Sequence, residues 1–358
     1  MDDREGFRRA LLSWYRKNRR DLLWRRTRDP YAILVSEVLL QQTRIQVGEA
    51  YYRRFMARFP SVEVLAGARL EEVLRIWEGL GYYRRARLLH AAAKEIVERH
   101  DGLVPQDLKG LTALPGVGPY TAGAVASIAY GQPVAAVDGN VTRVLVRLGR
   151  IDESVALAGT KARILKEAAN LVPERDPGTF NQALMELGAL VCLPRVPACG
   201  ECPVLAWCAG RAAGEETSLP LRTPRSAVPS VTAVFGLLER PGEVLIVRRG
   251  QDELLGGLWA LPGGEIQQEE SPEDGLRRLL REKYELEVEP GPEIGRHVHT
   301  FSHKRWDAIG IRCSEVGAFH QSPGLRWVPW DGLNQLPLVP FHRAFLGAGG
   351  PPAPENLP

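Results

Sequence analysis

Two carboxyl groups stand in sequence contexts where each could do chemistry. Glu37 lies in the apolar stretch VSEVLLQQT, and Asp138 lies in AVDGNVTRV. Burying a carboxyl in an apolar stretch is costly unless its pKa rises, which is what a general acid near neutral pH requires. Each acid also has a structural interpretation, Glu37 on the solvated face of an amphipathic helix and Asp138 in an Asx turn that caps the next helix. Alone, neither acid identifies an enzyme.

A tight turn in the stretch LPGVGPYTAGAV is followed by Tyr120, at the start of a helix of small residues. The glycines Gly116 and Gly118, on either side of Val117, let backbone N–H groups approach an anion without a Cβ in the way, and the helix N-terminus adds its dipole. This turn could therefore hold one phosphate of a nucleic acid. Most such turns have no ligand, and the ring of Tyr120 could equally pack in a core.

Four of the five cysteines are clustered in the spacing C-x6-C-x2-C-x5-C, and they are Cys192, Cys199, Cys202 and Cys208. In a chain without a secretory signal, such clustering indicates a metal site rather than disulfides. The spacing differs from the paired C-x2-C arms of common zinc sites, and four thiolates can equally hold a [4Fe–4S] cluster. The spacing favours the cluster and leaves zinc open. Cys313 stands apart and is expected to be a small buried hydrophobe.

Together, the cysteine spacing and the LPGVG turn within a helical region resemble the helix-hairpin-helix DNA glycosylases of the endonuclease III superfamily. The resemblance implies that the cysteines bind a [4Fe–4S] cluster and that the hairpin, at about residues 108–128, anchors DNA. Bifunctional members carry a lysine where this chain has Tyr120, and that amine attacks the sugar and leads through a Schiff base to strand cleavage. A phenol cannot form the imine. The chain therefore resembles the adenine glycosylase (MutY) branch, which hydrolyses adenine from its pair with 8-oxoguanine.

Within that branch the resemblance gives each acid a role. Glu37 matches the acid that protonates N7 of adenine, and Asp138 matches the carboxylate that stabilises the oxocarbenium-like sugar. Tyr120 and Asn140 match the neighbours that complete this site. Cleaving an N-glycosidic bond needs a proton for the departing base and a negative charge beside the sugar, so two carboxyls in different environments suit the reaction.

Further positions match residues that hold the adenine or the DNA. The adenine-binding positions are Arg20, Trp24, Arg25 and Gln182, and Leu23 departs from the family's L-P-W-R pattern. The positions that match wedges into the base stack, or contacts on the 8-oxoguanine side, are Gln42, Thr43, Leu80 and Tyr82, and the hairpin contacts are Gly116, Val117 and Gly118. Because extruding a base costs stacking and pairing energy, a side chain has to fill the vacated space.

The stretch GGEIQQEESPEDGLRRLLREKYEL resembles the Nudix box, G-x5-E-x7-R-E-U-x-E-E-x-G-U, where U is aliphatic. The matching positions are Gly264, Glu270, Arg278, Leu280, Glu282 and Leu286. Leu279, Lys283 and Glu285 stand where the box has Glu, Glu and Gly. Magnesium-bound pyrophosphate chemistry needs clustered carboxylates, and a lysine puts a positive charge where the metal would sit. We therefore expect a Nudix-like fold without hydrolase activity.

In the adenine glycosylase branch this second domain reads 8-oxoguanine. The FSH stretch, Phe301, Ser302 and His303, matches the loop that contacts the oxidised base. The hydroxyl of Ser302 can donate or accept a hydrogen bond, so it could tell the N7–H of 8-oxoguanine from the N7 acceptor of guanine. Without the resemblance, a polar loop at a strand end that contains a histidine would be unremarkable.

The periodicity of the apolar residues predicts the helices and strands that position these residues. From Arg8 to Arg211, amphipathic stretches alternate with short Gly, Pro or polar turns, which indicates helices. From Val231 the pattern becomes strand-like, with one helix at SPEDGLRRLLREKYEL. The expected strands lie at VTAVFGLLER, GEVLIVRR, RHVHTFSH, AIGIRC and LRWVPW. We therefore predict a multidomain fold, an all-α helix-hairpin-helix glycosylase domain with a [4Fe–4S] cluster linked to a smaller α+β Nudix-like domain.

The predicted domain boundaries follow the same change of pattern. They are residues 1–214 for the catalytic domain with its cluster loop at 192–208, 215–229 for a linker rich in Pro, Ser and Thr, 230–346 for the Nudix-like domain, and 347–358 for a disordered tail.

Charge is unevenly distributed along the 358 residues. Residues 1–225 carry 33 Lys and Arg against 25 Asp and Glu, whereas residues 226–358 carry 13 against 18. A basic first part suggests a polyanionic partner, although a GC-rich genome would explain the preference for arginine equally well. The sequence has neither an apolar run of membrane length nor a signal core. We expect a cytoplasmic, nucleoid-associated monomer that binds duplex DNA containing 8-oxoguanine:adenine and has no membrane partner.

Three alternatives compete with the interpretation as a monofunctional adenine DNA glycosylase. A thymine or oxidised-pyrimidine glycosylase of the same superfamily is disfavoured by the Nudix-like domain and by the stretches SEVLLQQT and FNQAL. A catalytically silent DNA-damage binder would have lost Glu37 or Asp138, and both are present. A nucleotide pyrophosphohydrolase is disfavoured by the degenerate box.

Overall fold

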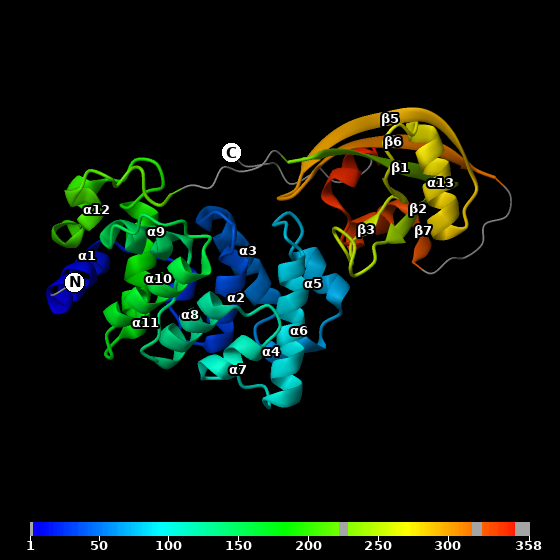
Figure 1. Cartoon of the computed structure of the whole chain (residues 1–358). Coiled ribbons are helices and arrows are strands. Elements are labelled where there is room, and N and C mark those ends of the chain that lie inside the picture. The colour runs from blue at the N-terminus through cyan, green and yellow to red at the C-terminus, as the bar shows by residue number, and fades with distance from the viewer. Residues whose placement is uncertain (1–2, 222–227, 317–323, 348–358) are drawn as a thin grey trace. The chain divides into compact units, whose positions relative to one another are not determined.

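The chain forms two compact units in the computed structural model, which describes residues 3–221, 228–316 and 324–347 (Figure 1). The first unit contains Met1–Gly67 and Leu88–Arg225, and the second contains Ala68–Arg87 and Ser226–Pro358. Most of the predicted tail at residues 347–358 and part of the predicted linker lie outside the described residues. Among the described residues, no helix has the length and apolar character needed to cross a membrane.

The first unit is helical, as the sequence predicts. Its helices are α1 (Arg4–Asn18), α2 (Pro30–Leu40), α3 (Ile45–Arg58), α4 (Val62–Gly67), most of α6 (Arg84–Arg99), α7 (Leu108–Ala113), α8 (Pro119–Tyr130), α9 (Gly139–Leu148), α10 (Ala158–Leu171), α11 (Pro177–Leu190) and α12 (Ala209–Ala212), with short 3-10 turns η1 (Leu23–Arg25), η2 (Cys199–Glu201) and η3 (Leu205–Trp207). α1, α9, α10 and α11 surround a core that includes Phe7, Val144, Phe180 and Leu187, all nearly inaccessible to solvent.

Helix α2 is buried on all sides rather than on one face. Asp29 caps its N-terminus by accepting hydrogen bonds from the backbone N–H groups of Tyr31 and Ala32, and Pro30 occupies the first turn. Every residue from Tyr31 to Leu39 is buried, because α2 packs against both α3 and α8 (Figure 1). Any polar side chain on this helix therefore lies in the interior.

The hairpin consists of α7, the turn that follows it, and α8. Gly116 has φ +76°, a left-handed conformation that favours glycine, and Gly118 is the N-cap of α8. Gly123 allows the close approach of the next segment, since a Cβ there would lie 2.3 Å from the carbonyl oxygen of Ala135. The small residues of α8 thus bring its first turn close to α2 and to the loop before α9.

The second unit is built on a mixed sheet. Its strands are β1 (Ser230–Arg240), β2 (Glu243–Arg248), β3 (Trp259–Ala260), β4 (Gly263–Glu265), β5 (Val288–Thr300), β6 (Arg305–Glu315) and β7 (Leu325–Pro329). The order is β3-β2-β1-β6-β5, β4 pairs with β1, and β7 pairs with β2. β1 and β6 are parallel, and the other pairs are antiparallel. The five predicted strands are confirmed, whereas β3 and β4 are too short to show an alternation.

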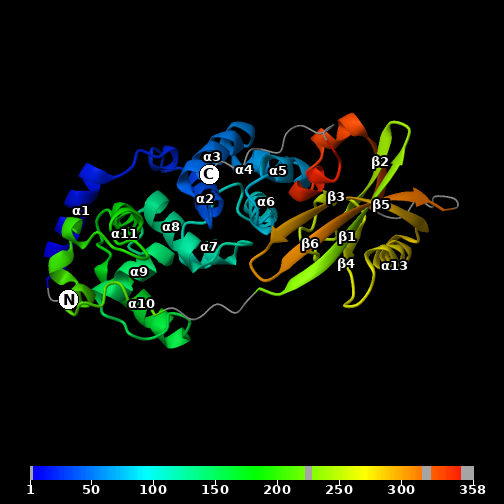
Figure 2. The same cartoon turned by 90° about the horizontal axis from the view of Figure 1, so that it is seen from above.

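Helix α13 (Pro272–Tyr284) packs against β1, β4 and β5 (Figure 2). Its N-cap is Ser271, whose hydroxyl accepts a hydrogen bond from the backbone N–H of Asp274. The unit also holds α5 (Leu70–Ile76), η4 (Trp330–Gln335) and η5 (Pro340–Ala344). Cys313 is buried in this unit, which confirms its predicted role as a small hydrophobe. The predicted fold class, helical first and mixed α and β second, is confirmed.

Candidate active site

Glu37 is buried in the middle of α2, with 7% of its surface exposed. The alternative that it lies on a solvated helix face is therefore wrong. Burial raises the pKa of Glu37 to about 7, against a hydrogen bond from Tyr120 that lowers it, and the charge of Asp138 raises it further. Glu37 is thus a carboxyl that holds its proton near neutral pH.

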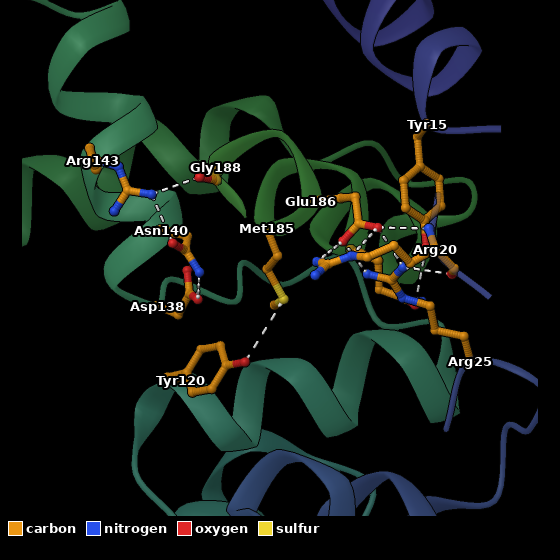
Figure 3. Close-up of polar contacts among 11 residues, drawn as sticks. Tyr15, Arg20, Arg25, Tyr120, Asp138, Asn140, Arg143, Met185, Glu186 and Gly188 are labelled. Atoms are coloured by element: carbon orange, nitrogen blue, oxygen red, sulfur yellow. Dashed lines mark hydrogen bonds and ion pairs between the residues drawn. The ribbon is translucent and has the colours of Figure 1, made fainter. Parts of the chain in front are cut away.

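Tyr120 stands in the first turn of α8, and its hydroxyl donates a hydrogen bond to Oε2 of Glu37. The hydroxyl oxygen of Tyr120 also lies 3.8 Å from the sulfur of Met185 on α11 (Figure 3). Burial and the nearby charges of Glu37 and Asp138 raise the pKa of Tyr120 well above its usual value, so the phenol stays neutral. Tyr120 orients Glu37 rather than packing in an apolar core.

Asp138 is the N-cap of α9, which confirms the structural interpretation without excluding a chemical one. Its Oδ1 accepts a hydrogen bond of 2.7 Å from the backbone N–H of Val141, and its Oδ2 accepts one of 3.1 Å from Nδ2 of Asn140. Burial raises the pKa of Asp138, although these hydrogen bonds oppose the shift. Both carboxylate oxygens are therefore held in place by donors.

Asn140 is in turn fixed by Arg143. The guanidinium of Arg143 donates to Oδ1 of Asn140 at 2.8 Å, to the carbonyl of Gly188 at 2.7 Å and to the carbonyl of Cys192 at 2.8 Å. Figure 3 shows Asp138, Asn140 and Arg143 in a row that ends on Gly188. Arg143 thereby ties the Asp138 side of the site to the C-terminal end of α11.

Glu186, also on α11, is a site residue that sequence reasoning missed. It is 1% exposed and accepts hydrogen bonds from both Arg20 and Arg25, at distances from 2.6 to 3.0 Å (Figure 3). Burial alone would raise its pKa, but the hydrogen bonds from Arg25 and Arg20 lower the pKa of Glu186 to about 2. Glu186 lies in the apolar stretch FNQALMELGA, as Glu37 lies in VSEVLLQQT, so the same sequence signal could have identified it.

The other predicted adenine-binding residues lie around this ion pair. Trp24, in η1, is buried and packs edge-on against Tyr52 with the ring centroids 5.5 Å apart. Oε1 of Gln182 accepts a hydrogen bond of 3.3 Å from the hydroxyl of Tyr15, and Arg25 stacks on the Tyr15 ring. The charge of Arg25 also acts on Glu37, so the arginine pair and the buried acid belong to one site.

The predicted DNA-contacting residues of the first unit follow α2 or lie in the hairpin. Gln42 is exposed and has φ 56°, and Thr43 beside it is partly buried. Val117 is buried under the hairpin turn between Gly116 and Gly118. Leu80 and Tyr82 lie in Ala68–Arg87, the segment that groups with the second unit, where Tyr82 is half exposed.

The four clustered cysteines line one cavity of the first unit, together with Arg147 and Glu216. Arg147 is fully buried, and it donates to Sγ of Cys192 at 3.2 Å and to the carbonyls of Leu193, Pro194 and Leu219. A buried cation that faces thiols fits a site whose sulfurs become anionic when they hold metal. Among the described residues, no three or more His, Cys, Asp or Glu side chains are grouped closely enough to hold a single metal ion.

In the second unit, Phe301, Ser302 and His303 form a turn between β5 and β6, closed by a hydrogen bond from the Phe301 N–H to the carbonyl of Lys304. Ser302 and His303 are exposed. In the degenerate box, Arg278 binds both Glu270 and Glu282, and Lys283 lies 3.5 Å from Glu253. These charged side chains of the box are therefore paired with one another or, for Lys283, with Glu253 outside the box.

Comparisons with known proteins agree with both units. Residues 35–174 match the HhH-GPD superfamily of base excision DNA repair proteins, and residues 233–348 match the NUDIX domain. The chain is 36% identical to the adenine DNA glycosylase of Rattus norvegicus and 35% identical to that of Homo sapiens. These alignments cover 92% of this chain, and 75% and 71% of those proteins.

Solved structures resemble the helical part. A thermostable thymine-DNA glycosylase is 30% identical, with a TM-score of 0.53 over 59% of this chain and 97% of that one. A trapped endonuclease III–DNA covalent intermediate is 26% identical, with a TM-score of 0.50 over 60% of this chain and 99% of that one.

Proposed function

The chain belongs to the adenine DNA glycosylase family of base excision repair enzymes, and we propose that it hydrolyses the N-glycosidic bond of adenine paired with 8-oxoguanine, after the adenine has flipped out of the duplex. The observation that carries the proposal is a buried carboxyl, Glu37, whose pKa is about 7 and whose neighbour is a phenol. This pair offers a proton donor at neutral pH without an amine nucleophile.

Glu37 acts as the general acid. In its protonated form it gives its proton to N7 of the flipped adenine, so that the base leaves as a neutral species. Because the hydroxyl of Tyr120 donates to Oε2 of Glu37, the other oxygen carries the proton to be transferred. The ionised Glu37 left after the transfer keeps the hydrogen bond from Tyr120.

Asp138 stabilises the positive charge that develops on the deoxyribose as the bond breaks. The N–H of Val141 and the amide of Asn140 hold its carboxylate in one orientation, so little reorganisation is needed when the charge appears. Water then adds to the sugar and leaves an abasic site. Tyr120 cannot form an imine with the sugar carbon, so the enzyme is monofunctional and the strand stays intact.

Arg20, Trp24, Arg25 and Gln182 form the pocket for the adenine. Glu186 forms an ion pair with each of the two arginines and fixes their guanidinium groups. Gln42 and Thr43 fill the space in the base stack, and Leu80 and Tyr82 contact the DNA on the 8-oxoguanine side. The backbone of Gly116, Val117 and Gly118 with the N-terminus of α8 binds a phosphate. In the second unit, Phe301, Ser302 and His303 read the 8-oxoguanine.

Cys192, Cys199, Cys202 and Cys208 hold a [4Fe–4S] cluster in the cavity that they line. When bound, the cluster supplies a cross-link between the end of α11 and the loop that leads to α12. Arg147 offsets part of the negative charge of the four thiolates, and Arg143 contacts the carbonyl of Cys192 on the side that faces Asn140.

The proposal is tested with duplexes that carry adenine opposite 8-oxoguanine, guanine or thymine, and thymine opposite guanine. Treating half of each reaction with alkali reveals abasic sites. We expect alkali-dependent cleavage at adenine, fastest opposite 8-oxoguanine. Release of thymine with adenine untouched would instead support the thymine glycosylase alternative, to which the helical part is also similar.

A further inference from the structure

Glu265, at the end of β4, joins two residues that follow the FSH stretch. Its Oε1 accepts a hydrogen bond of 2.5 Å from Nζ of Lys304 and one of 2.7 Å from the indole N–H of Trp306. β4 pairs with β1, and β1 lies beside β6, so the carboxylate reaches the loop from the body of the sheet. One acceptor on a rigid strand thus fixes two donors next to the loop.

The first connection closes the turn. The backbone carbonyl of Lys304 accepts a hydrogen bond of 2.8 Å from the N–H of Phe301, which makes the two residues the ends of the FSH turn. Because Glu265 holds the ammonium of Lys304, the position of one end of the turn depends on this ion pair.

The second connection holds the ring of Phe301. Trp306 is 2% exposed, and its ring contacts Phe301 edge-on with the centroids 5.0 Å apart. Phe301 also contacts His299 edge-on, with the ring centroids 4.5 Å apart. The guanidinium of Arg249 lies 5.7 Å from the Trp306 ring. The hydrogen bond to Glu265 therefore fixes the indole against which Phe301 packs.

The surroundings of Glu265 favour the ionised form of its carboxyl group. Partial burial alone would raise its pKa, but the hydrogen bonds from Lys304 and Trp306 and the charges of Lys304 and Arg249 lower the pKa of Glu265 below its usual value. The carboxylate is therefore ionised, and both hydrogen bonds are charge-assisted.

We propose that Glu265 is a positioning residue for the recognition of 8-oxoguanine, which it supports by holding Lys304 and Trp306 and thereby the backbone and the Phe301 ring of the FSH turn. This inference rests on the proposed reading of 8-oxoguanine by Phe301, Ser302 and His303. Glu265 itself does not contact the base. It sets the geometry of the residues that do.

The test compares E265Q and K304M with E287Q as a matched control. Glu287 also accepts two hydrogen bonds from a cation, but its partner is Arg281, and neither residue belongs to the FSH turn. Single-turnover rates are measured on 8-oxoguanine:adenine and guanine:adenine duplexes, and their ratio is the specificity. Melting temperatures of all variants show whether the fold is kept.

We expect E265Q and K304M each to lower the specificity about three- to tenfold, with the guanine:adenine rate unchanged, because weaker charge-assisted hydrogen bonds loosen only the reading loop. The double variant E265Q/K304M should lose no more than E265Q alone, since Lys304 acts through Glu265, whereas Glu265 also holds Trp306. E287Q should keep the wild-type ratio.

Three results overturn the inference and are distinguishable from one another. If S302A lowers the ratio while both E265Q and K304M leave it unchanged, the turn reads 8-oxoguanine without help from Glu265. If S302A leaves the ratio unchanged as well, the proposed reading by the turn is itself wrong. An equal loss on both duplexes in E265Q and K304M would mean a general destabilisation and would also overturn the positioning role.

Discussion

The phenol hydroxyl of Tyr120 donates its hydrogen bond to the buried carboxyl of Glu37, and the two residues lie 83 positions apart in the sequence. The contact joins the first turn of α8 to the middle of α2, so the hairpin of α7 and α8 also supplies a hydrogen bond to the buried acid. The side chain that the proposed function requires to lack an amine therefore also lowers the pKa of Glu37, against the larger effect of burial.

Replacing Glu37 with Gln should abolish adenine release while leaving DNA binding intact. The amide has no proton to give at N7, and loss of a general acid costs about 100- to 10,000-fold in rate. Single-turnover assays and a binding titration on the same 8-oxoguanine:adenine duplex measure both effects. E98Q, which changes an exposed acid of α6, should behave as wild type. Turnover by E37Q near the wild-type rate would remove Glu37 from this role.

The rate should fall as the pH rises through about 7, because the acid works only when it is protonated and burial raises the pKa of Glu37 to about that value. The hydrogen bond from Tyr120 opposes this rise in pKa. In Y120F the pKa of Glu37 should therefore be higher still, and the alkaline limb of the profile should move to higher pH. Single-turnover rates between pH 5 and 9 measure this, and a shift to lower pH would contradict the proposed contact.

Burial of Glu37 should also cost stability at high pH. Its folded pKa lies above its unfolded value, so the folded state binds more protons between about pH 4.5 and 7 and loses stability as the pH rises through this window. At pH 8, E37Q should be more stable than wild type by up to about 3 kcal/mol, and the difference should shrink towards pH 5. Urea unfolding of the helical unit at both pH values checks the prediction, and a difference that does not depend on pH would contradict it.

Much of this site could be predicted from the residues. The cysteine spacing and the LPGVG turn in a helical region carry the resemblance to helix-hairpin-helix glycosylases, and the expected roles of the two acids follow from that resemblance rather than from the acids themselves. The burial of Glu37 was harder to infer, because an acid in an amphipathic helix usually faces water, and only the packing of α3 and α8 on both sides of α2 removes that option. The pairing of Glu37 with Tyr120 depends on tertiary contacts that no local pattern encodes.

Glu186 shows where sequence reasoning stopped short. Its neighbour Gln182 was selected by resemblance, while Glu186 was passed over although it lies in the same apolar helix. A buried acid on such a helix needs a cation as its partner. The stretch RRDLLWR contains the two cations that fill this role, Arg20 and Arg25, but the resemblance assigned them to adenine binding alone.

The grouping of Ala68–Arg87 with the second unit cannot be read from any local pattern either, because it depends on contacts with residues far along the chain.

Glu186→Gln should destabilise the helical unit by about 3–5 kcal/mol at neutral pH, because it leaves Arg20 and Arg25 without their shared anion. The folded pKa of Glu186 is about 2, below its unfolded value, so its contribution is present above about pH 4.5 and is lost as the pH falls towards 2. The gap between E186Q and wild type should therefore narrow in acid. Urea titrations at pH 7 and pH 4 measure it, with E215Q, an exposed partner of Arg150, as the control.

Arg147→Gln should weaken the metal site. The substitution removes the donor to Sγ of Cys192 and to the carbonyls of Leu193, Pro194 and Leu219. Leu219 is buried, so the loss of the hydrogen bond to its carbonyl costs about 1–3 kcal/mol. We expect less iron per chain and faster loss of visible absorbance in the presence of a chelator. R150Q, which changes an exposed arginine of the next turn, should retain its iron. Equal iron retention in R147Q and R150Q would contradict the role of Arg147.

Tyr120→Lys should separate the two activities of the bifunctional relatives. A lysine ammonium at this position would lie beside Glu37 and hold that carboxyl ionised, so the variant should release adenine far more slowly than wild type. On a duplex that already carries an abasic site opposite 8-oxoguanine, no general acid is needed for base loss. There the amine, once deprotonated, can form an imine with the sugar aldehyde, and borohydride should trap a covalent complex. Y120F should trap none, because it has no amine.

If Y120K traps nothing on the abasic duplex, the side chain of residue 120 does not reach the sugar. If Y120K instead releases adenine at the wild-type rate, a charge at residue 120 does not control the protonation of Glu37.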